Sequence, residues 1–244
     1  VKNVNKNCKV IHRINECDER KNTNGINEYY INANKVADFT VFVSQWLKDI
    51  FIQAGFSSSY SNVIMSGSNK KVFNNKDRII WRKNQPLRIV THHWGNNFNK
   101  GFDIYEKLDS LLSSSKYQHL EFSYIGNVPS GVSFNNTEVK EALSGKDLAN
   151  EIKKNQIYLT ASINEPSGNH HIEAAQCGLP ILYLESGGVP EYCGKYGVSF
   201  KNDIEKSLEM LIHNYGEYRD KLKKYPHNSN KMCDEFLSCF QELV

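Results

Sequence analysis

The sequence has no long apolar run, and its positive and negative charges nearly cancel. No stretch of the 244 residues approaches the roughly 18 apolar residues of a membrane-spanning helix. The formal net charge is only +3, and acidic and basic residues are interspersed. This balance excludes the polybasic surface that nucleic acid or an anionic membrane would require. We therefore expect a soluble globular protein that does not bind nucleic acid.

The six cysteines form no CxxC pair, and none is spaced with histidine as in a zinc site. They are scattered at positions 8, 17, 177, 193, 233 and 239. We expect reduced thiols, no metal site and a cytoplasmic protein. The polar run that follows Val1 contains no signal-peptide pattern, which favours the same location.

Strand-like apolar runs alternate with helix-like runs, a pattern typical of βαβ units and a parallel sheet. The predicted strands are Lys9–Ile14, Phe39–Val43, Val63–Met65, Leu87–His92, Leu120–Ile125, Ile157–Ile163, Ile181–Leu184 and Val198–Phe200. The predicted helices are Glu28–Ala37, Gln45–Ala54, Phe102–Leu112, Asp147–Lys154, 168–177, Ile204–Tyr215 and Lys231–Leu243. We expect a loop over 128–144. The fold class is therefore α/β, a Rossmann-like parallel sheet with flanking helices.

A Ser-rich stretch at 56–62 is typical of a linker and divides the chain near residue 60. We expect one unit over 1–60, a second over 61–225 and a C-terminal helix within 226–244. That helix has an apolar stripe formed by Met232, Phe236, Phe240 and Leu243. We expect this stripe to pack onto one of the two units.

The segment Asn164–Glu173 carries the strongest functional signal. Its two carboxylates, Glu165 and Glu173, bracket a Ser-Gly turn between a strand-like run and a helix-like run. Ligands of α/β sheets bind at the carboxyl ends of strands, beside helix N-termini. Two acids there can hold sugar hydroxyls, and the free N–H groups of the helix can hold phosphate. This pattern predicts a nucleotide-sugar site, although solvated glutamates are the ordinary alternative.

Polar residues at other predicted strand ends extend this site. Lys100 lies at a strand-to-helix turn, near His92 and His93, where a lysine can neutralise a diphosphate. The glycines of Gly126-Asn127 and Gly187-Gly188 would bring backbone N–H groups to the same edge, although simple turns also explain them. His170 and His171 contact the sugar or phosphate in one interpretation, and cap or pack the helix in the other.

Taken together, these motifs resemble the C-terminal donor-binding domain of the family 4 retaining glycosyltransferases, which have the GT-B fold, plus the tail of their N-terminal domain. The resemblance covers about residues 37–200, and the segment around Glu165 is its most specific part. The matching pieces are Phe42–Leu47, Val63–Gly67, Lys100–Asp103, Tyr124–Asn127, Glu165–Glu173 with Gly178–Pro180, and Gly187–Glu191.

The resemblance implies two Rossmann-like domains that face each other across a cleft, with the nucleotide-sugar donor held mainly by the C-terminal one. It assigns donor-sugar hydroxyls to Glu165, the diphosphate to Lys100 and the ribose to Glu173. Glu165 and Lys100 would be the catalytic pair, and no metal ion or other cofactor is required. The donor-binding set is completed by Gly168, Asn169, His170, His171, His93, Gly126 and Asn127.

Two departures from the family are visible. Trp94 stands six residues before Lys100, where the family usually has an arginine. Only about 60 residues precede the second unit, so the N-terminal Rossmann-like domain is expected to be incomplete. The run Asn15–Arg20 is expected to end its first strand.

The predicted function is transfer of a sugar from a nucleoside diphosphate to a glycan or lipid-linked acceptor, with retention of anomeric configuration. A lipid-linked acceptor would bring the protein into peripheral contact with a membrane. The alternative is a non-catalytic module that binds a nucleotide sugar and lacks the acceptor half. Another GT-B enzyme, an epimerase or a phosphorylase, is a third hypothesis. An oxidoreductase is disfavoured because no GxGxxG follows the first strand. The base, the sugar, the acceptor and the oligomeric state stay open.

Overall fold

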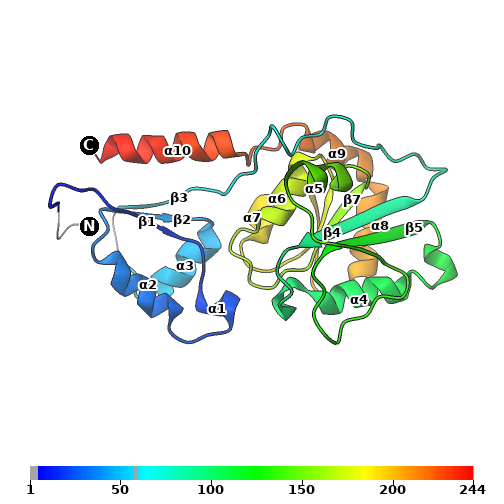
Figure 1. Ribbon diagram of the computed structural model, residues 1–244, viewed down its shortest axis with the longest axis horizontal. Helices are drawn as coiled ribbons and strands as arrows, with labels where there is room; N and C mark the ends of the chain where they lie inside the picture. Colours follow the sequence, from blue (N-terminus) through cyan, green and yellow to red (C-terminus); the bar gives the residue numbers. More distant parts are fainter. Residues whose placement is uncertain (1–4, 58–59, 244) are drawn as a thin grey trace.

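The protein consists of two α/β units side by side, linked by the chain after β3 and by the return of the last helix (Figure 1). The computed structural model describes residues 5–57 and 60–243. The start at Val1, part of the predicted linker at 56–62 and the last residue of the predicted C-terminal segment lie outside the described residues.

The larger unit is built on a six-stranded, fully parallel sheet in the order β6-β5-β4-β7-β8-β9. The central strands are continuous apolar runs because helices cover both of their faces, as is usual for parallel sheets. This confirms the predicted α/β class. The strands are β4 Leu87–His93, β5 Leu120–Gly126, β6 Glu138–Lys140, β7 Ile157–Thr160, β8 Ile181–Leu184 and β9 Gly197–Phe200.

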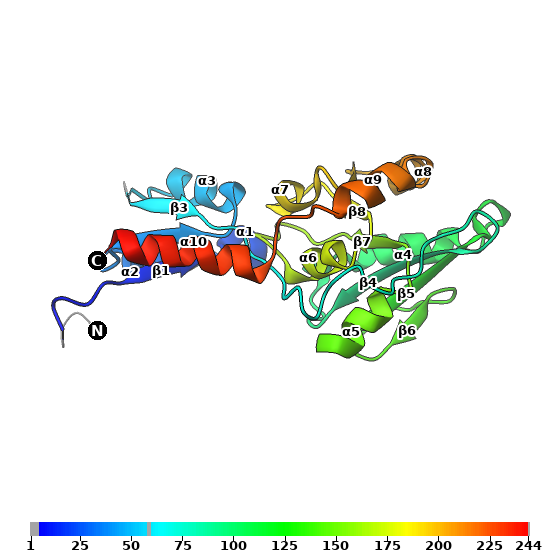
Figure 2. The ribbon, with the colours of Figure 1, turned by 90° about the horizontal axis from the view of Figure 1, so that it is seen from above.

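Helices cover the sheet from both sides (Figure 2). Neighbouring strand residues point to opposite faces: Ile89 packs with α4, α8 and α9, whereas Val90 packs with α5, α6 and α7. Two apolar cores therefore sandwich the sheet. The helices are α4 Phe102–Leu111, α5 Gly145–Ile152, α6 Asn169–Gln176, α7 Val189–Cys193, α8 Ile204–His213 and α9 Tyr215–Leu222.

The smaller unit has a three-stranded parallel sheet in the order β1-β2-β3. The strand expected at Val63–Met65 was predicted to open the second unit, and this was wrong. Residues 61–63 form β3 and pair with β2, with Phe42 opposite Val63. The elements are β1 Ile11–Ile14, α1 Asp18–Lys21, α2 Ile26–Asn34, β2 Phe39–Phe42, α3 Gln45–Gln53 and β3 Ser61–Val63.

The last helix, α10 Ser229–Glu242, leaves the larger unit and lies along the smaller one (Figures 1 and 2). Its stripe packs against Phe39, Val41 and Ile64, as expected for a helix that covers a sheet. One stripe residue was misassigned: Phe240 is 49% exposed, and Cys239 takes the buried position. Where the chain crosses back, Ser68 forms a parallel bridge with Asn228, and the Ser229 N–H donates to the Ser68 carbonyl at 2.8 Å.

The loop predicted over 128–144 contains the short edge strand β6. The carboxylate of Asp109 accepts hydrogen bonds from the N–H groups of Asn135 and Asn136 at 3.0 and 2.8 Å. These contacts fix the chain just before Glu138, so that β6 pairs with β5. The strand was missed because its three residues are mostly polar and exposed.

The segment Gly187–Cys193 joins the two units. The Glu191 carboxylate accepts hydrogen bonds from the N–H groups of Gln45 and Trp46 at 2.8 and 2.7 Å, and so caps α3. The Tyr192 hydroxyl donates to the Val43 carbonyl at 2.5 Å and accepts from the Ser66 N–H at 2.9 Å. Both residues belong to α7 of the larger unit.

Replacing Tyr192 by phenylalanine should lower the free energy of unfolding by about 2–3 kcal/mol, because it leaves a buried carbonyl and a buried N–H without partners. Urea unfolding followed by circular dichroism measures the loss. Tyr29→Phe is the matched control, since the Tyr29 ring is 69% exposed. Equal stability of the two variants would contradict the bridging role of Tyr192.

Candidate functional site

A cavity of about 320 Å³ opens at the carboxyl ends of β4, β5 and β7. Strands β5 and β6 lie on one side of β4 and β7 lies on the other, so the topology switches direction at this place. Crevices at such switch points are the usual ligand sites of open α/β sheets. The lining residues are His92, His93, Trp94, Gly95, Lys100, Ile125, Ala142, Leu143, Leu148, Glu165, Gly168, Asn169, His170 and Glu173.

The turn between β7 and α6 has an unusual backbone. Asn164 has a φ of 49°, and Gly168, at the N-terminus of α6, has a φ of 66°. A Cβ atom at Gly168 would lie 2.7 Å from the His170 ring and 3.0 Å from the Glu165 side chain. Glycine therefore leaves room for both side chains beside this turn. Left-handed backbone of this kind is concentrated at functional sites.

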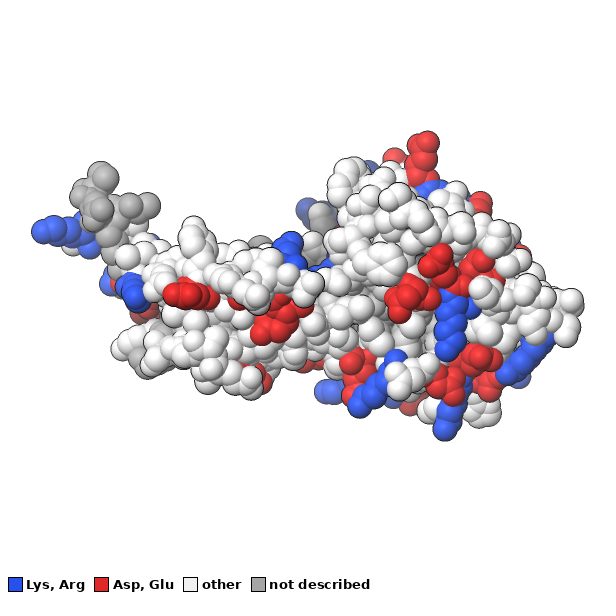
Figure 3. Space-filling view, turned by 90° about the horizontal axis from the view of Figure 1, so that it is seen from below, with Lys and Arg blue, Asp and Glu red and all other residues white. Residues whose placement is uncertain are grey.

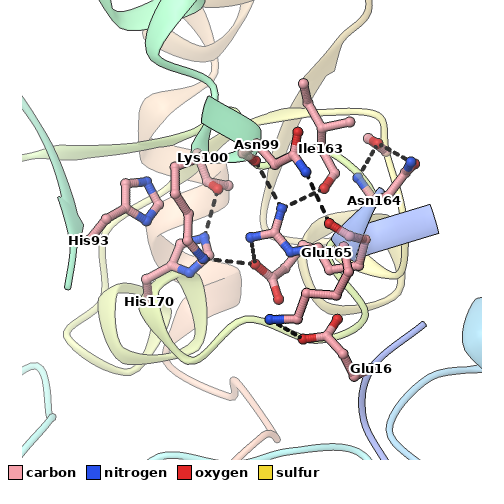
Figure 4. A network of polar contacts seen from close by, with 12 residues as sticks. Glu16, His93, Asn99, Lys100, Ile163, Asn164, Glu165 and His170 are labelled. Atoms are coloured by element: carbon pink, nitrogen blue, oxygen red, sulfur yellow. Dashed lines mark hydrogen bonds and ion pairs between the residues drawn. The ribbon is translucent and has the colours of Figure 1, made fainter. Parts of the chain in front are cut away.

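Glu165 is the centre of a nearly buried group of charges (Figure 4). Its Oε2 atom accepts from Lys100 Nζ at 3.1 Å and from Arg20 Nη2 at 2.8 Å. The exposed fractions of the Glu165, Lys100 and Arg20 side chains are 12%, 17% and 6%. Burial lowers the pKa of Lys100, whereas Glu165 opposes that shift.

Arg20 is a site residue that the sequence analysis missed. It comes from α1 of the smaller unit, and its Nη1 atom donates to the carbonyls of Asn99 and Ile163 at 3.0 and 2.8 Å. The Asn99 side-chain amide donates in return to the Arg20 carbonyl at 3.0 Å. The one signal in the sequence was the position of Arg20 soon after the first strand, at the edge where ligands bind.

Glu173 faces the same cavity from the second turn of α6. Its Oε2 atom lies 3.0 Å from His92 Nε2, and the other ring nitrogen of His92 lies 3.2 Å from the Tyr158 hydroxyl. The structure thus brings Glu165, Glu173 and Lys100 to one cavity. The sequence predicted this, because the three residues follow strands whose carboxyl ends meet at one edge of the sheet. His92 was noted in the sequence only as a neighbour of His93.

His93 and His170 form the floor of the cavity, with ring centroids 4.7 Å apart. His93 Nε2 is 2.7 Å from the Tyr105 hydroxyl, and His170 Nε2 is 2.8 Å from the Thr160 hydroxyl. Burial, followed by nearby positive groups, holds the pKa of both histidines well below the usual range. Both rings are therefore neutral near pH 7.

The fold and one segment of the chain match known proteins. Residues 134–228 match the family described as glycosyl transferases group 1. A glycosyltransferase from Rickettsia africae has a TM-score of 0.71 at 16% identity, over 96% of this chain and 70% of that one. HepE from Anabaena, in complex with UDP and glucose, has a TM-score of 0.73 at 13% identity, over 96% and 71%. The chain has the fold of the GT-B glycosyltransferases.

Curated relatives match this chain over a shorter stretch. The gpi3 subunit of phosphatidylinositol N-acetylglucosaminyltransferase from Schizosaccharomyces pombe is 24% identical over 151 residues, which is 55% of this chain and 32% of the relative. The GPI3 subunit from Saccharomyces cerevisiae is 28% identical over 121 residues, or 45% and 26%. The matched part is therefore about a third or less of these relatives.

Three of the residues that the sequence assigned to donor binding lie outside this cavity. His171 is fully buried one position further round α6, beside the Tyr192 ring at 5.4 Å, and neither of its ring nitrogens has a hydrogen-bond partner among the described residues. Gly126 and Asn127 line a neighbouring hollow instead. The Asn127 side chain donates to the Trp94 carbonyl at 2.7 Å, so it fixes the loop that carries Trp94.

Gly187 and Gly188 were expected to line the crevice. They instead pack against the backbone of the turn that carries Glu165. Gly187 has a φ of 64°, and a Cβ atom there would lie 2.5 Å from the Glu165 carbonyl oxygen. The Gly188 N–H donates to the same carbonyl at 2.9 Å. Neither glycine is among the residues that line the cavity.

A second cavity, of about 480 Å³, lies between the units and meets the first at Lys100 and Glu165. It is lined by Glu16, Arg20, Lys21, Asn22, Asn97, Phe98, Asn99, Lys100 and Glu165. Lys21 and Glu16 pair with each other at 3.0 Å, so they neutralise one another at its rim.

On the face in Figure 3, basic and acidic residues are interspersed over the larger unit. In residues 5–57 and 60–243, no three His, Cys, Asp or Glu side chains are grouped as a metal ion would need. Within the same ranges, no helix is both long and apolar enough to cross a membrane.

Proposed function

We propose that this chain is the donor-binding part of a retaining, family 4 type glycosyltransferase. The observation that carries the proposal is the convergence of Glu165, Glu173 and Lys100 on one cavity at the switch point of the sheet. The match of residues 134–228 to glycosyl transferases group 1 supports it, since that segment contains both glutamates.

The geometry suggests a role for each group. A nucleoside diphosphate would place its phosphates at the N-terminus of α6, where the N–H groups after Gly168 and the Lys100 ammonium supply positive charge. Glu173, oriented by His92, would hold ribose hydroxyls. Glu165 would hold a hydroxyl of the transferred sugar. We propose that this site needs no metal ion, since fixed cations can stabilise the leaving diphosphate.

The relatives guide the proposal on substrates. HepE was solved with UDP and glucose, so UDP is the first nucleotide to test. The curated relatives are subunits of a phosphatidylinositol N-acetylglucosaminyltransferase, which favours a lipid-linked acceptor and partner subunits here. We therefore propose peripheral contact with a membrane on its cytoplasmic side.

Binding of a nucleoside diphosphate tests the proposal. In calorimetry against UDP, GDP, ADP and CDP, one of the four should bind, and it should also raise the melting temperature. Lys100→Ala should weaken that diphosphate at least tenfold and leave the nucleoside unchanged, because only the phosphates contact Lys100. Lys195→Ala, at an exposed lysine, is the control. Folded protein that binds none of the four would contradict the proposed donor pocket.

The alternative is a module that binds a nucleotide sugar without transferring it. One observation favours it, because both cations at the site contact the carboxylate of Glu165, the group that would hold a sugar hydroxyl. Hydrolysis of the bound donor, followed by NMR, separates the two. Release of free sugar with the anomeric configuration of the donor supports the retaining enzyme, and binding without release supports the module.

A further inference from the structure

Two cations share one carboxylate oxygen at the junction of the two cavities. Arg20 Nη2 and Lys100 Nζ both contact Glu165 Oε2, and the nearby Lys21–Glu16 pair cancels its own charge. His93 and His170 are neutral near pH 7, as their lowered pKa values require. The cluster of Arg20, Lys100 and Glu165 therefore has a net charge of +1, and it is largely buried.

The two cations are held in different ways. The Arg20 guanidinium is fixed by three acceptors, the Glu165 carboxylate and the carbonyls of Asn99 and Ile163. In the part of the chain that the structure describes, Glu165 is the one hydrogen-bond partner of Lys100 Nζ. Lys100 also lines both cavities, whereas Arg20 lines only the one between the units. Lys100 is thus the cation that can move toward a ligand.

We propose that Arg20 is the permanent counterion of Glu165, and that its presence releases Lys100 to bind the donor diphosphate. This inference rests on the proposed function. When the diphosphate enters, Lys100 leaves Glu165 Oε2 for a phosphate oxygen, and the carboxylate keeps Arg20 as its partner. Arg20 does not touch the diphosphate. It is a positioning residue, supplied by the smaller unit, that acts through Glu165.

The removal of Arg20 should therefore weaken diphosphate binding indirectly. Without Arg20, Glu165 keeps Lys100, because the carboxylate would otherwise be buried without a counterion. We expect Arg20→Gln to bind UDP about 10- to 100-fold more weakly than the wild type and to bind uridine equally well. Arg20→Lys, which keeps a positive charge, should lose less than about threefold.

The double variant R20Q/E165Q separates this role from a structural one. With the carboxylate gone, nothing competes for Lys100, so UDP affinity should return to within about threefold of the wild type. Arg13→Gln, at an exposed arginine of the same unit, is the matched control. All variants are compared as the 244-residue chain by calorimetry with UDP and uridine. If the wild type binds another of the four nucleoside diphosphates instead, that diphosphate and its nucleoside replace UDP and uridine, and the same criteria apply.

The outcomes are distinct. UDP affinity of R20Q equal to that of the wild type would overturn the inference, as would a double variant that stays tenfold weaker. If R20Q does not fold, the double variant R20Q/E165Q decides alone. UDP affinity within threefold of the wild type supports the inference, and affinity tenfold weaker overturns it. Wild-type protein that binds none of the four nucleoside diphosphates would overturn the proposed donor pocket, and this inference with it.

Discussion

Lowering the pH from 6.5 to 4.5 should lower the free energy of unfolding of this protein by up to about 8 kcal/mol at room temperature. Three histidines, His93, His170 and His171, are buried, and burial is the main cause of their lowered pKa values; that of His171 falls to about 3. In the unfolded chain each would titrate near 6.5. As the pH falls below 6.5, the three buried rings stay neutral in the folded protein, whereas those of the unfolded chain become protonated.

Unfolding therefore takes up protons in this window, and the free energy of unfolding falls as the pH falls. Each histidine contributes about 1.4 kcal/mol per pH unit, so three contribute about 4 kcal/mol per pH unit. A typical total stability of about 5–15 kcal/mol would be exhausted within roughly one to four pH units. Urea titrations monitored by circular dichroism at several pH values measure this slope.

His171 offers the sharpest control for the acid effect. His171→Leu removes a buried ring whose two nitrogens have no partner, so the slope should fall by about 1.4 kcal/mol per pH unit. His119→Gln, at an exposed histidine, should leave the slope unchanged. A stability that is flat between pH 6.5 and 4.5 would show that these histidines titrate normally in the folded protein.

Glu165→Gln should lower the free energy of unfolding by about 3 kcal/mol, or roughly 6–12 °C in melting temperature. The amide has nearly the same shape, so the loss comes from leaving Arg20 and Lys100 close together without their shared carboxylate. Differential scanning calorimetry without ligand measures the shift.

Glu121→Gln is the matched control for this prediction. Glu121 pairs with Arg88 at 2.8 Å, but both side chains are more than 40% exposed, and exposed pairs contribute little. Addition of Arg20→Gln to Glu165→Gln should recover part of the loss, because one uncompensated cation is removed. A melting temperature within 1–2 °C of the wild type, about 0.5 kcal/mol, would mean that solvent screens the three charges.

The sequence predicted the central sheet because its strands are continuous apolar runs that no surface segment would carry. Leu87–His92 and Leu120–Ile125 differ from β4 and β5 by a single residue at the end. The edge strand β6 was missed because pairing with β5, rather than its own composition, makes it a strand. The helix α1 was missed because it has only four residues.

At the site, too, the residues next to recognisable strands were predicted, whereas a contact between distant parts of the chain was not. Glu165, Glu173 and Lys100 were predictable because each follows a recognisable strand, and parallel strands bring their ends to one edge. Arg20 reaches Glu165 from 145 residues away, and no local pattern signals that contact. His171 was misplaced because adjacent helix residues point about 100° apart, and the sequence does not say which of two histidines faces inward.

The two crossings between the units reduce the motions that are open to the protein. The chain passes through Ser68 toward the larger unit and returns through Asn228, and the two passages are bonded side by side. A single linker would allow rotation about several axes, whereas two joined linkers restrict it to bending about one. The paired passages therefore help to keep the smaller unit in one orientation, with Arg20 held beside Glu165.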